Sequence, residues 1–99
     1  MIDADAIIRT LRSHQRELRA AGIRHLSLFG SVARGASHAT SDVDLAAEIE
    51  PQSRMDLLEL VSLERRLGEL LGCRVDLLPE PVEKVRLQAA IDRERRRAF

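Results

Sequence analysis

The sequence predicts a small α/β (α+β) fold in which helices pack on one face of a mixed β-sheet. Apolar residues recur at helical spacing in some segments, while other short apolar runs have the length of a strand. Glycine or proline stands at several of the boundaries between them. In chain order, the expected helices and strands are residues 3–21, 25–29, 42–48, 53–71, 73–78 and 82–96. The 99 residues suffice for one domain, residues 1–99, and are too few for two.

The first expected helix, residues 3–21, is amphipathic. Asp3 or Asp5 can cap its start, and Gly22 can end it. His14 lies near the apolar stripe, and a partly buried surface histidine is a better interpretation than a ligand. The residues at the helical spacing are Ile7, Ile8, Leu11, Gln15 and Leu18.

The strand expected at residues 25–29 delivers Gly30 and Ser31 at its carboxyl end. A glycine lets the backbone approach a phosphate closely, and a helix opening just after Ser31 would aim free N–H groups at it. The next segment, residues 35–41, is rich in small and polar residues and predicts a loop. We expect His38 in that loop to be solvated rather than to contact a ligand.

Two carboxylates stand two residues apart where the next strand begins. A strand projects residues i and i+2 to the same side, so Asp42 and Asp44 should lie together. Such a pair is destabilising unless a cation lies between its members, and Mg²⁺ prefers carboxylate oxygens together with substrate phosphates. An isolated Asp-x-Asp is more often a solvated strand end. The opposite face of this strand predicts core at Val43, Leu45, Ala47 and Ile49.

The third expected strand, residues 73–78, carries a further acid. Asp76 alternates with apolar neighbours and should therefore point away from their side, which makes it the third carboxylate of the site. Pro79 and Pro81 are expected to break this strand.

The two later helices predict structure rather than chemistry. Ser53 is the expected N-cap of the helix at residues 53–71, with Asp56 at the capping-box position. Its leucines predict core, with part of the surface available to a partner. The final helix, residues 82–96, should bury a weak apolar side, and the arginine-rich run from 93 to 97 is expected to be a solvated face. The expected inward positions are Leu57, Leu60, Val61, Leu63, Leu67, Leu70 and Leu71 in the first helix, and Val82, Val85 and Ala89 in the second.

Composition excludes several classes of function. The net charge is zero and aromatic residues make up 2% of the chain, so neither a basic field nor a base-stacking surface for direct nucleic-acid binding is expected. No apolar run approaches membrane-spanning length. The single Cys73 cannot form an internal disulfide, which fits a cytoplasmic location.

Taken together, the motifs resemble those of the nucleotidyltransferase superfamily, whose signature is Gly-Ser, a spacer and Asp-x-Asp. They are most similar to the minimal nucleotidyltransferases, the MNT-type antitoxins, and the likeness spans nearly the whole chain. The matching residues are Gly30, Ser31, Ala33, Arg34, Gly35, Ser41, Asp42, Asp44 and Leu45.

The resemblance implies a DNA polymerase beta-like fold and a two-metal mechanism. Asp42, Asp44 and Asp76 would be the catalytic carboxylates and the ligands of two Mg²⁺ ions, with Asp76 assigned from strand order alone. Gly30 and Ser31 would bind the phosphates of ATP. Arg34 would reach the triphosphate or remain on the surface. The resemblance also implies a hetero-oligomer with a small all-helical HEPN-type toxin, on which the chain would transfer AMP to a tyrosine hydroxyl.

Two other functions remain open. The first is a non-catalytic antitoxin that acts by binding its toxin. The second is a nucleotidyltransferase that acts on a small molecule or an RNA end. The chain contains no tyrosine, so it cannot modify itself at that residue type.

Overall fold

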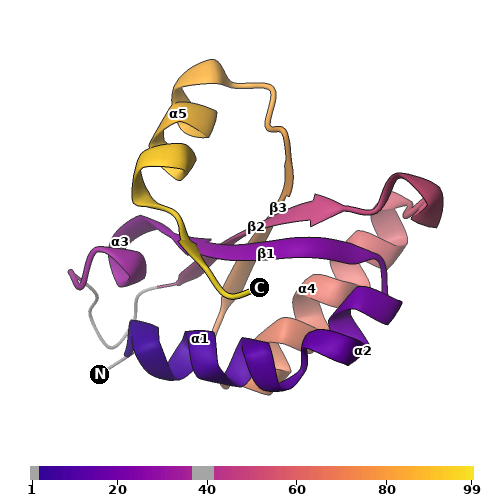
Figure 1. Ribbon diagram of the computed structural model, residues 1–99, viewed down its shortest axis with the longest axis horizontal. Coiled ribbons are helices and arrows are strands. Elements are labelled where there is room, and N and C mark those ends of the chain that lie inside the picture. The colour runs from indigo at the N-terminus through magenta and orange to yellow at the C-terminus, as the bar shows by residue number, and fades with distance from the viewer. Residues whose placement is uncertain (1–2, 37–41) are drawn as a thin grey trace.

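The computed structural model describes residues 3–36 and 42–99 and contains a four-stranded mixed sheet (Figure 1). Its strands lie in the order β3-β2-β1-β4. β1 is antiparallel to both β2 and β4, while β2 and β3 are parallel. The strand bounds are β1 Ile23–Phe29, β2 Val43–Ile49, β3 Val75–Glu80 and β4 Arg96–Arg97. The helices are α1 Ala4–Ser13, α2 Gln15–Ala20, α3 Gly30–Ala33, α4 Leu57–Leu71 and α5 Val85–Glu94, with a 3-10 turn, η1, at Pro51–Ser53.

Helices cover both faces of the sheet (Figure 1). On one face, α1, α2 and α4 enclose the main core, which receives Leu28, Leu45 and Leu77 from three adjacent strands. On the other face, Ile91 of α5 packs against Phe29 and Ala46. The predicted mixed α/β class is therefore confirmed. The expectation that helices pack on one face is wrong for α5, because alternate strand residues also form a small apolar patch on the second face.

The expected helix at residues 3–21 is two helices. The backbone of His14 leaves the helical region, with φ −107° and ψ 15°, and separates α1 from α2. The break does not interrupt the core, because Leu11 before it and Leu18 after it are both buried. At the start of α1, the side chain of Asp3 accepts a hydrogen bond from the Asp5 N–H at 3.0 Å, so the predicted cap is confirmed.

The start of α4 lies three residues later than predicted. The cap is Asp56, whose Oδ1 accepts a hydrogen bond from the Glu59 N–H at 2.8 Å, and Ser53 instead ends the 3-10 turn that Pro51 begins. The buried face of the helix is narrower than predicted. Leu63 and Leu67 are buried, whereas Leu57 is 74% exposed, contrary to the prediction.

The C-terminal third departs most from the predictions. β3 continues through Pro79 to Glu80, which an edge strand tolerates because the missing N–H can face away from the sheet. In α5, Ile91 is fully buried, whereas Val85 is 81% exposed and Ala89 is also exposed, so the predicted apolar side is wrong within the helix. The predicted Val82, just before the helix, does pack against the apolar cluster of the second face. Arg96 and Arg97 are not helical. They form β4 beside β1, because Ala98 and Phe99 after them enter the main core.

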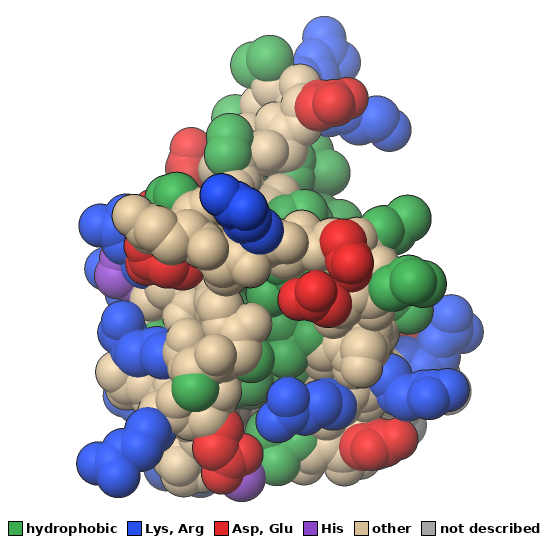
Figure 2. Space-filling view, turned by 90° about the vertical axis from the view of Figure 1, so that its right-hand side faces the viewer, with side chains coloured by type: hydrophobic (Ala, Val, Ile, Leu, Met, Phe, Trp, Pro, Cys, Tyr) green, Lys and Arg blue, Asp and Glu red, His purple; other side chains and the backbone are tan. Residues whose placement is uncertain are grey.

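The surface mixes both signs of charge. Figure 2 shows acidic and basic side chains interspersed on one face, with exposed hydrophobic side chains among them. In the part of the chain that the structure describes, no helix has the length and hydrophobicity needed to cross a membrane. Among residues 3–36 and 42–99, the large hydrophobic residues that are more than half exposed are Leu57, Leu58, Val61 and Val85.

Candidate active site

The corner at the end of β1 is closed by a glycine that no other residue can replace without strain. Gly30 has a φ of +79°, in the left-handed region, and opens the short helix α3. A Cβ built at this position would overlap the carboxylate of Asp44. Glycine therefore brings the backbone of the corner directly against an acidic side chain of the neighbouring strand.

Two of the predicted acids are paired across β2 and β3, and the third, Asp42, lies close enough to act on Asp44 electrostatically. Asp44 is the register partner of Asp76 across these parallel strands, and it is also opposite Phe29, the residue before the glycine corner. Adjacent strands lie about 4.8 Å apart, so the two carboxylates are immediate neighbours. Asp42 comes directly before β2, and its Oδ1 lies 3.9 Å from Nε of the exposed Arg74. The structure thus brings the predicted carboxylates together.

The electrostatics of Asp44 reflect this crowding. Burial raises the pKa of its carboxyl, and the negative charges of Asp76 and Asp42 raise that pKa further. Arg34 opposes the shift and Glu94 adds to it, so both side chains are close enough to act on Asp44. An ionised Asp44 is disfavoured here unless positive charge is added. Such a position suits a carboxylate that binds a cation during function.

A further acid, Glu94, accepts hydrogen bonds from residues at the glycine corner, and the sequence analysis did not predict this contact. The N–H of Gly30 donates to Oε2 of Glu94 at 3.1 Å. Nη1 of Arg34 donates to Oε1 of the same carboxylate at 2.8 Å. Ser31 is half-buried beside Gly30, and its backbone carbonyl accepts from the Ala36 N–H at 2.9 Å. Ser41 and His38 lie outside the described residues.

Within residues 3–36 and 42–99, no group of three or more His, Cys, Asp or Glu side chains is arranged to hold a metal by itself. Mg²⁺ usually takes one or two protein carboxylates and completes its shell with water and substrate phosphates, so the paired Asp44 and Asp76 are enough to supply its protein ligands. Burial and the two neighbouring acids raise the pKa of Asp44 in spite of the positive charge of Arg34, so a bound cation would favour its ionised form. The donor set of Asp42, Asp44 and Asp76 therefore fits Mg²⁺ that arrives with a nucleotide.

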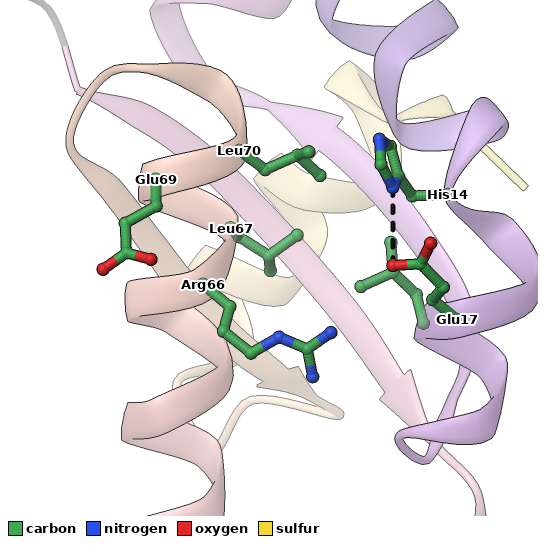
Figure 3. Close-up of a pocket in the computed structure, with 7 residues that line it drawn as sticks. His14, Glu17, Arg66, Leu67, Glu69 and Leu70 are labelled. Carbon is green, nitrogen blue, oxygen red and sulfur yellow. Dashed lines mark ion pairs between the residues drawn. The ribbon is translucent and has the colours of Figure 1, made fainter.

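A cavity of about 360 Å³ lies elsewhere, between α2 and α4 on the other side of the sheet (Figure 3). His14 and Glu17 line one wall, with Nδ1 and Oε2 3.5 Å apart, and Arg66 lines the other. The floor includes Leu67, a residue of the main core. None of the predicted site residues lines it, so the glycine–carboxylate corner remains the candidate active site.

A model of the nucleotidyltransferase domain matches residues 8–99 of this sequence. The chain belongs to the nucleotidyltransferase family. The family match covers the glycine corner and all three acids, and the predicted resemblance is thereby confirmed.

Relatives of this nucleotidyltransferase include the protein adenylyltransferase MntA of Thermococcus cleftensis. The two are 36% identical over 95 residues, which cover 95% of this chain and 94% of the relative.

Solved structures show the same fold. A toxin-antitoxin structure with AMP-PNP has a TM-score of 0.72 and 22% identity, and the match covers 99% of this chain and 73% of the other. A complex of a tri-AMPylated Shewanella oneidensis HEPN toxin with its MNT antitoxin has a TM-score of 0.67 and 18% identity, with 93% and 71% covered.

Proposed function

We propose that this nucleotidyltransferase transfers AMP from ATP to a tyrosine hydroxyl of a HEPN-type toxin and so acts as its antitoxin. The observation that carries the proposal is the pairing of Asp44 with Asp76 beside the glycine corner. The curated relative that covers nearly the whole chain is named a protein adenylyltransferase, which favours a protein as the acceptor. Solved relatives of the same fold hold AMP-PNP or an AMPylated HEPN toxin, which favours ATP and a toxin partner.

In this proposal the residues of the glycine corner bind the phosphates and the three acids bind the metal ions. Gly30 N–H, the Ser31 hydroxyl and Arg34 hold the β- and γ-phosphates, so that the α-phosphorus faces the acceptor. Asp42 and Asp44 are the ligands for Mg²⁺, and Asp76 shares this role on the side where the acceptor arrives. Two Mg²⁺ ions held by these carboxylates would neutralise the triphosphate and lower the pKa of the attacking hydroxyl.

The tyrosine oxygen attacks the α-phosphorus and forms a new P–O bond, while the bond from that phosphorus to the bridging oxygen breaks. Pyrophosphate leaves with the bonding electron pair. The hydroxyl proton passes to the carboxylate of Asp76 and then to water. Asp76 is exposed, so solvent can take the proton from it.

The test uses the chain, ATP labelled at the α-phosphate, Mg²⁺ and a HEPN-type toxin. We expect label on the toxin, and none with the double variant Asp42→Asn, Asp44→Asn. If that variant neutralises the toxin as well as the parent does, the antitoxin acts by binding and the catalytic proposal is wrong. Label on RNA or on a small molecule, with none on protein, would reassign the acceptor.

A further inference from the structure

The two hydrogen-bond donors expected to meet the triphosphate are already bound to an acid of the chain itself. Glu94, the last residue of α5, accepts from the Gly30 N–H through Oε2 and from Arg34 Nη1 through Oε1. Both carboxylate oxygens are used, one for each donor, which is how a terminal phosphate would use two of its own oxygens. The Glu94 side chain is only 20% exposed, whereas that of Arg34 is 52% exposed.

Glu94 adds to the negative charge around Asp44. Its charge contributes to the raised pKa of Asp44, so a further negative charge is held beside acids that already repel one another. A carboxylate free to turn into solvent would relieve that repulsion. The hydrogen bonds from Gly30 and Arg34 must therefore outweigh the repulsion between Glu94 and the neighbouring acids. These bonds join parts of the chain that are separated by 64 and 60 positions, respectively.

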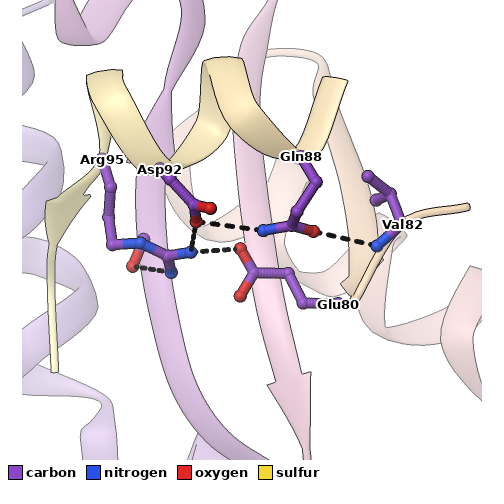
Figure 4. Close-up of polar contacts among 6 residues, drawn as sticks. Glu80, Val82, Gln88, Asp92 and Arg95 are labelled. Atoms are coloured by element: carbon purple, nitrogen blue, oxygen red, sulfur yellow. Dashed lines mark hydrogen bonds and ion pairs between the residues drawn. The ribbon is translucent and has the colours of Figure 1, made fainter. Parts of the chain in front are cut away.

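A polar network next to Glu94 fixes the helix that carries it (Figure 4). Arg95 donates to Glu80 Oε1 at 2.7 Å, to Asp92 Oδ1 at 3.1 Å and to the hydroxyl of the fully buried Ser27 at 3.1 Å. Gln88 extends the network, because its amide donates to Asp92 and accepts from the Val82 N–H. With Ile91 buried as well, the end of α5 is held to β1 and β3, and Glu94 is aimed at the glycine corner.

We propose that Glu94 is an internal competitor for the nucleotide phosphates. It occupies the Gly30 and Arg34 donors in the nucleotide-free chain, and an incoming triphosphate must displace it. This inference rests on the proposed function in one respect, the assignment of those two donors to the phosphates. The consequence is a lower affinity for free nucleotide than the donors alone would give, and a link between nucleotide binding and the C-terminal end of α5.

The experiment measures dissociation constants by calorimetry for inorganic triphosphate without metal and for AMP-PNP with Mg²⁺. In Glu94→Gln the amide oxygen can still accept from Gly30 N–H, but the charge that holds Arg34 is gone. We expect both dissociation constants to fall about three- to tenfold, since exposed or half-exposed ion pairs of this kind are weak. The matched control is Glu83→Gln, which removes the same charge from an exposed position just before α5 and should change neither constant more than about twofold.

A double-mutant cycle tests the route of the effect. If Glu94 competes through Arg34, the gain from Glu94→Gln should shrink when Arg34→Gln is already present. In the parent protein, the ¹³C resonance of the Glu94 carboxylate should shift when triphosphate binds, and this measurement requires no variant at position 94.

The outcomes separate this inference from the proposed function. If the parent binds nucleotide and Glu94→Gln binds it equally well or more weakly, Glu94 is not a competitor and the nucleotide site stands. The same conclusion follows if the Glu94 resonance stays fixed while the Gly30 amide resonance shifts on binding. If neither the parent nor Glu94→Gln binds AMP-PNP, the proposed function and the competitor are both wrong. If Glu83→Gln tightens binding as much as Glu94→Gln does, the effect is one of net charge and the specific contact of Glu94 is overturned.

Discussion

Asp44 on β2 and Asp76 on β3 are register partners in a parallel strand pair, on the sheet face that α5 partly covers. Parallel register places their carboxylates side by side without any contribution from a loop. The alternate residues of the same strands, Leu45 and Leu77, enter the main core and fix that register. The position of the acids is thus a direct consequence of core packing on the other face.

Replacing Asp44 with Asn should abolish adenylyl transfer while the nucleotide-free fold becomes more stable at neutral pH. The variant removes a carboxylate whose ionised form is disfavoured by burial and by Asp76 and Asp42. Thermal unfolding and the label assay on the same preparations check both parts. A marked loss of stability would mean that Asp44 is a structural residue.

The stabilisation by Asp44→Asn should depend on pH in a defined direction. The pKa of Asp44 is raised in the folded chain, so the folded state binds more protons than the unfolded state and loses stability as pH rises through that pKa. The advantage of Asn should be full above the raised pKa and should vanish below the ordinary value of 3.8. Urea unfolding of parent and variant across this range measures it, and an advantage that grows in acid would contradict it.

Gly30→Ala should destabilise the fold and remove nucleotide binding. Two effects combine, a left-handed backbone at φ +79° and a Cβ that overlaps the Asp44 carboxylate. Gly72→Ala is the matched control, because Gly72 has φ +70° with no atom within 4 Å of its Cβ position. Backbone strain alone costs about 1–2 kcal/mol, so we expect that loss for Gly72→Ala and a larger one for Gly30→Ala by denaturant unfolding. Equal losses would show that the contact with Asp44 is easily relieved.

Ser31→Ala should impair use of ATP more than it impairs the fold. The half-buried hydroxyl stands next to Gly30 at the corner, where it would donate to a phosphate oxygen. Loss of one hydrogen bond to a charged group corresponds to about 1.5–3 kcal/mol, or roughly ten- to a hundredfold in kcat/KM. Ser62→Ala, on the exposed side of α4, controls for loss of a hydroxyl. Unchanged kinetics with ATP would remove Ser31 from the site.

Leu67→Asp should unfold the domain. Leu67 is 1% exposed within the main core, and a buried unpaired carboxylate together with the lost packing should destabilise by about 4 kcal/mol or more. Leu58→Asp introduces the same side chain on the same helix at a position that is 80% exposed, and it should fold normally. Circular dichroism distinguishes the two. A folded Leu67→Asp would show that the core has been assigned to the wrong face of α4.

Local pattern predicted the parts of the site that are close in sequence. Alternation in β2 predicted that Asp44 points to the other side of the sheet from Val43 and Leu45. Alternation in β3 predicted the same for Asp76 relative to Val75 and Leu77. Both rules follow from the two-residue period of a strand and need no knowledge of distant contacts. The roles of these acids and of Gly30, Ser31 and Arg34 in catalysis or nucleotide binding remain predictions, for the experiments above to test.

Only the tertiary structure shows where the C-terminal segment packs and which residues it contacts. In the sequence, Glu94 is one charge in an arginine-rich run, and no periodicity links it to Gly30 or Arg34. Its contact arises because α5 packs on the second face of the sheet through Ile91 and is held there by Arg95, while Ala98 and Phe99 return to the first face. Periodicity determines which way a side chain points within its own element. Which distant partner it meets is decided only when packing fixes the elements against one another, because the free energy of that choice lies in contacts between residues far apart in the chain.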